Sequence, residues 1–363
     1  MPVDTTDRST TQGKNPMSAT SFTTSTDMTG SEQRSGLSRF TGLLGRGDGD
    51  VARVLILLLL VVVLGLIAPA FFSKASWIAT SQYSTQIVLL AIGQAFVIIT
   101  GGIDLSVGAV LGCSAMISAV SMRSMLGTGM DETLIVVVGF AIGVGSAAVM
   151  GLVNGLVITK MKITPFIATL GMLGVATGGT NLISGGSEIV ELPAQLNTVG
   201  NATVFGGWLT IPVLVTIVAA VVAGLVLSRT RFGMRTYAIG SNAAAARRAG
   251  IGVDRQLIKV YVLSGVMAGI AGVLLMSRFV DASPLAGADA ELASIAAAVI
   301  GGASLTGGRG SILGAVIGAA ITATLQTGLI LAGVASFWQT VAVGVIIVLA
   351  VFGDQLRITF SRA

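Results

Sequence analysis

Asp104 is the residue whose position in this sequence most needs a chemical explanation. It stands in GGIDLSVG, residues 101–108, between one apolar run over 87–100 and another over 107–120. An aspartate at the centre of a bilayer costs about 2.5–3.5 kcal/mol, whereas at a helix start it accepts hydrogen bonds from free backbone amides. We therefore predict a sharp turn in which Gly101 and Gly102 end one helix and Asp104 caps the next.

A second glycine-rich stretch is similar to the first. GGASLTGGRG, residues 301–310, repeats the pattern Gly-Gly-x-x-Leu-Ser/Thr. The repeat suggests an internal duplication, a common feature of transporters, although chance is a serious alternative in a chain with 49 glycines. We interpret both stretches as turns beside a gate. The candidate gate residues are Gly101, Gly102, Asp104, Ser106, Gly301, Gly302, Gly307 and Gly308.

Most catalytic chemistry is excluded by residues that the sequence lacks. It has no histidine, the commonest metal ligand and general base, and Cys113 is its single cysteine. No G-x-x-x-x-G-K-[ST] motif occurs, so we expect no ATP hydrolysis by the chain itself. We predict a protein that is not an enzyme, with no catalytic residues, no metal and no cofactor of its own.

Composition indicates which elements must position these residues. Of 363 residues, 53% are hydrophobic and only 10% are charged, against about 25% charged in an average soluble domain. One globule could not bury so much apolar surface, so we predict an all-α polytopic membrane protein. Arginines and lysines lie between the apolar runs, which fits membrane orientation and argues against nucleic acid as a partner.

About ten apolar runs approach the roughly 20 residues that a helix needs to cross a bilayer. The predicted spans are 53–72, 83–101, 104–122, 133–158, 163–184, 211–228, 256–279, 291–305, 310–332 and 337–353, of which 291–305 is short enough to be a half-membrane segment. With the N-terminus in the cytoplasm, twelve basic and three acidic residues fall on the inner side, as the positive-inside rule requires. Both termini are therefore expected in the cytoplasm.

The sequence also divides by composition along its length. Residues 1–50 are rich in Ser, Thr, Gly and Asp and are predicted to form a disordered cytoplasmic tail. Residues 51–355 form the predicted transmembrane domain, in which 229–256 is a large inner loop. Residues 356–363 are the predicted cytoplasmic C-terminus.

The loop 229–256 carries six arginines and contains a short predicted helix. Ser241 or Asn242 would cap this helix, the alanines over 243–249 would form it, and Gly250 would end it. Arg247 and Arg248 could pair with acids of another protein. From the residues alone, a docking helix and an alanine-rich connector that only sets orientation are equally supported.

Polar side chains inside the predicted spans are uncharged. In lipid such groups face other helices or a water-lined path, and hydrogen bonding between helices is the favoured role for any one of them. Amides also suit a neutral polyhydroxyl solute. The candidates for a translocation path are Gln94, Asn154, Thr169, Asn181 and Gln326.

Five stretches, in order, resemble the permease subunits of ABC-type monosaccharide importers, in the ribose/xylose/galactoside branch of the branched-chain amino acid/sugar permease superfamily. They are GGIDLSVGAVLG at 101–112, NGLVITKMKITPFIATLGML at 154–173, TRFGMRTYAIGSNAAAARRAGI at 230–251, VYVLSGVMAGIAG at 260–272 and AAVIGGASLTGGRGSILGAVIGA at 297–319. The resemblance covers roughly 50–355 and implies a fold of about ten transmembrane helices similar to the vitamin-B12-type (type II) ABC importer permeases.

The resemblance further implies partners, a location and a mechanism. It implies a homodimer or heterodimer in the bacterial cytoplasmic (inner) membrane, with cytoplasmic ABC ATPase subunits that use the ATP and a periplasmic or lipid-anchored sugar-binding protein. The solute would be a ribose-like monosaccharide, moved by alternating access. Permeases for autoinducer-2, nucleosides or branched-chain amino acids are alternatives, and an ion-coupled secondary carrier is less favoured because no row of membrane-embedded acids is visible.

The same resemblance favours the docking interpretation of the loop, because 241–253 lies where this family's coupling helix meets the ATPase. The candidate ATPase contacts are Ser241, Asn242, Ala243, Ala244, Ala245, Ala246, Arg247, Arg248, Ala249 and Gly250. Relatives often carry acids where this chain has Ala243 and Ala244. The arginines at 247 and 248 are therefore expected to carry more of the contact.

Overall fold

The computed structural model describes residues 48–335 and, beyond them, 337, 338, 341, 344, 345, 348 and 352. The chain separates into two units, Met1–Leu44 and Gly45–Ala363, and the described residues all belong to the second. The predicted C-terminus 356–363 and nearly all of the predicted tail 1–50 lie outside the described residues. The predicted domain limits therefore stay predictions.

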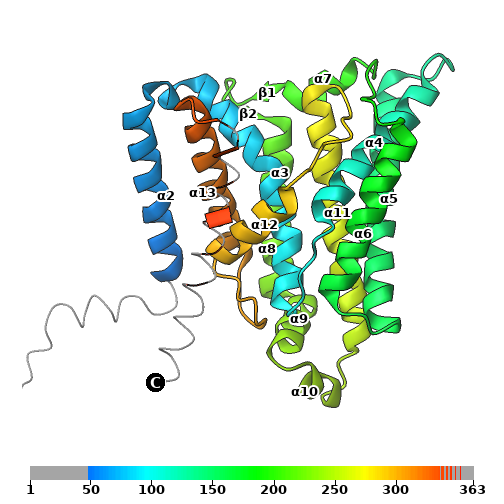
Figure 1. Ribbon diagram of the computed structural model, residues 1–363, viewed down its shortest axis with the longest axis vertical. Coiled ribbons are helices and arrows are strands. Elements are labelled where there is room, and N and C mark those ends of the chain that lie inside the picture. Colours follow the sequence, from blue (N-terminus) through cyan, green and yellow to red (C-terminus); the bar gives the residue numbers. More distant parts are fainter. Residues whose placement is uncertain are drawn as a thin grey trace, which may run out of the picture. The chain divides into compact units, whose positions relative to one another are not determined.

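The described part of the chain is almost entirely helical, which confirms the predicted all-α class (Figure 1). The described strands β1 and β2 are two residues long each, Thr203–Val204 and Leu209–Thr210, and pair with each other in antiparallel orientation. The elements in order are α2 Asp48–Ile67, η1 Pro69–Phe72, α3 Lys74–Ile99, α4 Val107–Met125, α5 Glu132–Lys160, α6 Pro165–Ser184, α7 Gln195–Asn201, β1 Thr203–Val204, β2 Leu209–Thr210, α8 Ile211–Arg229, α9 Arg231–Ser241, α10 Ala243–Arg248, α11 Val253–Phe279, α12 Ala290–Ile300 and α13 Ile312–Leu331.

Among the described residues, eight helices are long and apolar enough to cross a membrane: α2, α3, α4, α5, α6, α8, α11 and α13. They correspond to eight of the predicted spans, and α12 is a shorter apolar helix where 291–305 was expected to be short. α3 begins at Lys74 rather than at 83, because the Ser73 side chain caps it by accepting from Ser76 N (3.1 Å) and its first turns are polar. The predicted span 337–353 lies mostly outside the described residues.

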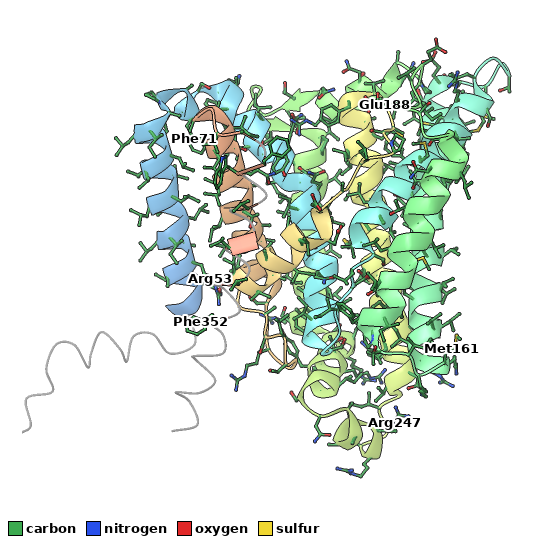
Figure 2. All side chains as sticks on the ribbon, viewed as in Figure 1. Arg53, Phe71, Met161, Glu188, Arg247 and Phe352 are labelled. Carbon is green, nitrogen blue, oxygen red and sulfur yellow. The ribbon has the colours of Figure 1, made fainter. Side chains whose placement is uncertain are left out.

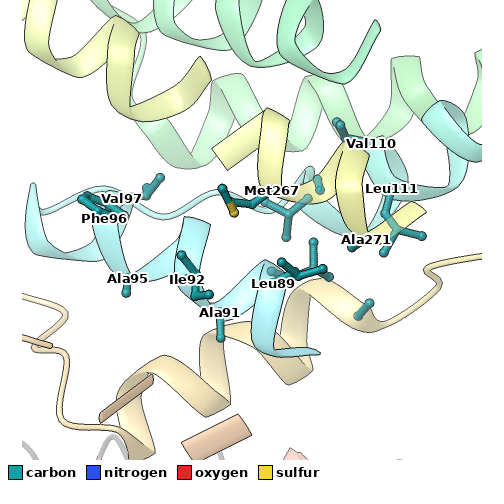
Figure 3. Packing of buried hydrophobic residues seen from close by; sticks show 14 of the residues in the cluster. Leu89, Ala91, Ile92, Ala95, Phe96, Val97, Val110, Leu111, Met267 and Ala271 are labelled. Atoms are coloured by element: carbon teal, nitrogen blue, oxygen red, sulfur yellow. The ribbon is translucent and has the colours of Figure 1, made fainter. Parts of the chain in front are cut away.

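α11 is the central helix and packs against α5, α3 and α4. Glycine permits its close approach to α5, since a Cβ added at Gly155 would lie only 2.8 Å from Cα of Ile258. Its buried side chains Met267 and Ala271 lie beside Leu89 of α3 in one continuous apolar cluster (Figure 3). This contact positions α3, and with it the turn that contains Asp104.

Apolar side chains also cover surfaces that no described helix packs against. Leu55, Leu59 and Leu66 of α2 and Val218 and Val222 of α8 are all more than half exposed. In a membrane protein such side chains face lipid acyl chains. The main packing partners of α2 are α13 and η1, so this helix stands at the edge of the domain.

Two of the irregular segments between the helices are 100–106 and 280–289. We call the end of the domain that carries α9 and α10 the α10 side, and the opposite end, which carries α7, the α7 side (Figure 1). Segment 100–106 starts at the α10 side and leads into α4, whereas 280–289 starts at the α7 side and leads into α12 (Figure 1). The two helix starts meet inside the domain, where the Glu291 carboxylate lies against Gly108.

Candidate functional site

The predicted coupling loop is ordered and forms two helices, α9 and α10, joined at Asn242. Of the two predicted caps, Asn242 caps α10, because its side-chain oxygen accepts a hydrogen bond from Ala245 N (2.9 Å). Gly250 follows with φ +80°, a left-handed conformation that turns the chain toward α11. The helix expected over 243–249 is observed as Ala243–Arg248.

α10 is held by one buried residue and otherwise faces outward. Ala246 is 4% exposed and packs with Ile239 of α9 and Val253 of α11. The other candidate contact residues are exposed: Ser241, Asn242, Ala243, Ala244, Ala245, Arg247, Arg248, Ala249 and Gly250. Because most of these side chains are small, another protein can approach the helix backbone closely.

The two arginines of α10 differ in their surroundings. Arg247 Nη2 pairs with Asp254 Oδ1 (3.2 Å), and Asp254 Oδ2 also pairs with Lys162 Nζ (3.3 Å). Exposed ion pairs contribute about 0–1 kcal/mol, so these pairs orient the loops more than they stabilise the fold. Arg248 has no ion pair with a described residue. Figure 2 shows Arg247 at the α10 side and Glu188 at the α7 side.

α9 fastens α10 to the transmembrane helices. The Phe232 ring packs on Phe96 of α3, with ring centroids 5.8 Å apart. Gln256 of α11 donates to the Phe232 carbonyl (3.0 Å) and to Thr236 Oγ1 (3.1 Å). The Tyr237 hydroxyl donates to the Gly310 carbonyl (2.7 Å), and burial raises the pKa of Tyr237, so this hydroxyl keeps its proton. α9 is thus attached to α3, α11 and the 301–310 turn.

Both glycine turns meet at the end of α9. A Cβ added at Gly240 would clash with the Ile99 carbonyl and lie 2.5 Å from Gly308 N. Gly308 N donates to the Ile99 carbonyl (2.9 Å), and a Cβ added at Gly307 would lie 3.1 Å from Cα of Gly101. We call Ile99, Gly101, Gly240, Gly307 and Gly308 the glycine junction. It joins the end of α3, the 301–310 turn and α9 through direct backbone contact.

The remaining glycines of the two turns lie beside the junction. Gly102 packs against the Tyr261 hydroxyl, which an added Cβ would approach to 2.6 Å. Gly301 packs on the backbone of Gly314 in α13, and Gly302 lies against the guanidinium of Arg53 in α2. The 301–310 turn therefore also contacts α2 and α13, which the spacing of its residues did not indicate.

Asp104 is buried and does not cap α4 as we predicted. Its carboxyl is 2% exposed: Oδ1 accepts from Ser106 N (3.0 Å) and Ser106 Oγ (2.6 Å), and Oδ2 accepts from Ser264 Oγ of α11 (3.0 Å). Asn154 of α5 donates to Ser106 Oγ (2.9 Å). α4 begins only at Val107, so Asp104 folds its own turn and ties it to α11 instead of capping the helix.

α6 closes this buried network from another direction. Thr169 Oγ1 accepts from Leu105 N (3.1 Å) and donates to the Pro165 carbonyl of its own helix (2.9 Å). Asn154 and Thr169, which we considered for a solute path, are thus both buried against the turn that Asp104 forms. Sequence reasoning missed Ser264, although a serine in the apolar run YVLSGV was a visible signal.

The other three path candidates lie apart from this network. Gln94 of α3 is fully buried, and its side-chain amide has no hydrogen bond in the described part of the chain. Asn181 is exposed on α6 and donates to the Thr177 carbonyl (2.9 Å), and Gln326 Oε1 accepts from the Tyr83 hydroxyl (2.5 Å). Among the described residues, no group of three or more Cys, Asp or Glu side chains could hold a metal ion.

Comparison with known proteins identifies the family. Residues 77–351 match the family described as "Branched-chain amino acid transport system / permease component". The chain belongs to this permease family. The match begins within α3, and every candidate site residue falls inside it.

Curated relatives of the permease import sugars according to their names. It is 40% identical over 303 residues to the ribose import permease protein RbsC of Bacillus subtilis (strain 168), covering 83% of this chain and 91% of the relative. It is 36% identical over 314 residues to the fructose import permease protein FrcC of Rhizobium meliloti, covering 82% and 84%. It is 34% identical over 302 residues to the D-allose transport system permease protein AlsC of Escherichia coli (strain K12), covering 83% and 90%.

These matches confirm the resemblance to importer permeases. Permeases of this family are transport subunits rather than enzymes, and the helices described above make the chain a multi-pass membrane protein. No solved structure matches the chain significantly.

Proposed function

We propose that the permease is the membrane-spanning subunit of an ATP-driven importer of a ribose-like monosaccharide. The glycine junction carries this proposal, because it joins α9, which continues into the exposed helix α10, to the two glycine turns 101–108 and 301–310 by direct backbone contact. A permease without its own ATPase motif has to be driven by a separate ATPase subunit, and such a connection would transmit that subunit's movement to the transmembrane helices. The names of the relatives support a monosaccharide as the solute.

The mechanism begins at α10, where an ATPase subunit docks on the exposed alanines and on Arg248. Movement of α10 is transmitted through Ala246 to α9, because this alanine is packed between α9 and α11. α9 in turn displaces the Ile99 carbonyl and Gly308, which it touches without intervening side chains. Since packed interfaces switch between discrete arrangements rather than deform, the turns move together.

The Asp104 network determines what moves with the turns. Its hydrogen bonds join segment 100–106 to α5, α6 and α11, so a displacement at Gly101 is shared by α4 and those helices. The other glycine turn, 301–310, lies between α12 and α13, so its displacement is shared by this second group of helices. Alternating access follows if these two groups of helices part first toward one side of the membrane and then toward the other.

The assembly we propose has two permease copies, identical or not, two cytoplasmic ABC ATPase subunits and a periplasmic or lipid-anchored sugar-binding protein. ATP is used by the ATPase, and the permease needs no cofactor. The α10 side carries Lys162, Arg247 and Arg248 and is the cytoplasmic side of the bacterial inner membrane by the positive-inside rule. Both chain termini then lie in the cytoplasm.

Branched-chain amino acids are the second candidate solute, because the description of the matching family names them. The sugar is favoured because three relatives that each align with more than four-fifths of the chain are named for ribose, fructose and D-allose. Permeases for autoinducer-2 or nucleosides stay further alternatives.

Transport by membrane vesicles tests the proposal. Sealed right-side-out vesicles would hold the full permease with its genomically neighbouring ATPase and would enclose ATP, and the binding protein would be added outside with labelled D-ribose, D-fructose, D-allose or L-leucine. We expect uptake of one of the sugars that requires ATP and the ATPase. Uptake driven by a proton or sodium gradient without the ATPase would contradict the proposal, as would uptake of leucine alone.

A further inference from the structure

The irregular segment 280–289 brings a carboxylate to the interior of the membrane domain. It runs from the end of α11 to Asp289, which precedes α12 and has φ +61°. α12 has 11 residues, so at about 1.5 Å per residue Asp289 lies up to roughly 16 Å from the turn at the α10 side. The Asp289 side chain is exposed, does not cap α12 and makes no hydrogen bond or ion pair with a described residue.

Asp289 lines a cavity of about 340 Å³ between α3, α12 and α13. Tyr83 and Gln86 of α3 and Gln326 of α13 also line it. The Tyr83 hydroxyl donates to Gln326 Oε1 (2.5 Å), which leaves the amide nitrogen of Gln326 available. The Gln86 side chain has no hydrogen bond with a described residue. This wall therefore combines available amide groups with one available carboxylate.

A second cavity, of about 230 Å³, lies on the other face of the same segment, between α4 and α6. Asp289 lines this cavity as well, together with Glu291, Thr177 and Thr180. A third cavity, of about 480 Å³ between α8 and α13, is by contrast walled mainly by valine, isoleucine, leucine and alanine. Polar walls are thus concentrated where segment 280–289 enters the domain.

An unpaired carboxylate within a membrane domain has to face water or a polar ligand. A monosaccharide hydroxyl donates to a carboxylate and accepts from an amide N–H, so a wall of one carboxylate and two amides fits a neutral polyol. We propose that Asp289, Gln86 and Gln326 form a hydroxyl-binding subsite for a monosaccharide within the permease. This inference rests on the proposed function and extends it, since the permease itself would then contribute to solute selection.

Cysteine accessibility tests the subsite. In a Cys113→Ser background, which removes the single native cysteine, two residues that line the cavity without belonging to the subsite would be replaced separately, as Ala288→Cys and Leu292→Cys. Each would be exposed to a membrane-impermeant thiosulfonate in vesicles with the partner subunits. We expect both to react, as Thr128→Cys in an exposed loop should, whereas Val222→Cys on the lipid-facing side of α8 should not. D-ribose, D-fructose or D-allose at about twice its Kd should slow both reactions about threefold and leave Thr128→Cys unchanged.

Two outcomes would overturn the inference while leaving the proposed function intact. The first is no reaction at either cysteine while Thr128→Cys reacts, because the cavity is then not open to water. The second is reaction that is not slowed by a sugar that vesicles of the unsubstituted permease import. If those vesicles import none of the three sugars, the proposed function fails, and the monosaccharide subsite fails with it.

Discussion

Replacing Gly240 by alanine should separate movement of α10 from movement of the transmembrane helices. The added methyl carbon would lie 2.5 Å from Gly308 N, and ordinary contact begins at 3.4 Å, so the two segments must part by about 0.9 Å. The methyl would also clash with the Ile99 carbonyl, a backbone atom that cannot rotate away. The glycine junction would therefore open on both sides.

The energetic cost follows from overpacking, which destabilises a well-packed site by about 1–3 kcal/mol. That energy corresponds to a change of about 5- to 150-fold in the equilibrium between a closed and an open junction. We expect the rate of ATP-dependent uptake by Gly240→Ala to decrease by about 5- to 150-fold. ATP hydrolysis by the docked ATPase should continue, because the surface of α10 is unchanged.

The assay compares ATP-dependent sugar uptake with ATP hydrolysis in the same vesicles, at equal amounts of permease. Gly145→Ala is the matched control, because a Cβ at this exposed position of α5 meets nothing within 4 Å. The control should transport as the unsubstituted permease does. If Gly240→Ala transports normally at normal abundance, the glycine junction does not transmit the movement and our reasoning is refuted.

Three further predictions concern the Asp104 network and α10. Asp104→Asn keeps an oxygen for Ser106 and should retain membrane abundance, whereas Asp104→Leu leaves buried hydroxyls unsatisfied at about 1–3 kcal/mol and should lower abundance severalfold on immunoblots. Arg248→Glu should weaken co-purification of the ATPase more than Arg247→Glu, because the Arg247 guanidinium is already paired with Asp254. Asn242→Ala should destabilise α10 by about 0.5–2 kcal/mol and speed amide hydrogen exchange over 243–248.

Each of these has a result that would contradict it. Equal abundance of the Asn and Leu variants at 104 would mean that the buried hydrogen bonds contribute little. An equal loss of ATPase from both arginine variants would mean that the ion pair with Asp254 opens on docking. Unchanged exchange in Asn242→Ala would show that tertiary packing at Ala246 alone holds α10.

Hydropathy and local rules were sufficient to predict most of the helices. The apolar runs located eight membrane helices, and the short run at 291–305 was recognised as shorter than a full span. Cap chemistry located α10 to within a residue, because Asn242 and Gly250 act through their own backbone neighbours. These features depend on a few adjacent residues, which is why the sequence reveals them.

Contacts between distant segments could not be predicted in this way. Nothing local indicates that Gly240 touches Ile99, because that contact depends on how α9 packs between α3 and α11. The role of Asp104 was predicted wrongly for a related reason, since its partner Ser264 lies on a helix far along the chain. The start of α3 was placed too late because its first turns are polar, and hydropathy alone does not mark a helix that begins with Lys74.

The position of α2 bears on how the protein is made. Leu64 of α2 packs against Gly328 of α13, so the first described helix to leave the ribosome finds this partner only after about 260 more residues have been synthesised. At about 5–20 residues per second, that wait lasts roughly 13–50 s. During it α2 must persist in lipid without its neighbour, and the wholly apolar run over 54–67 satisfies that requirement. A polar substitution on this helix would therefore harm insertion before it harmed the finished transporter.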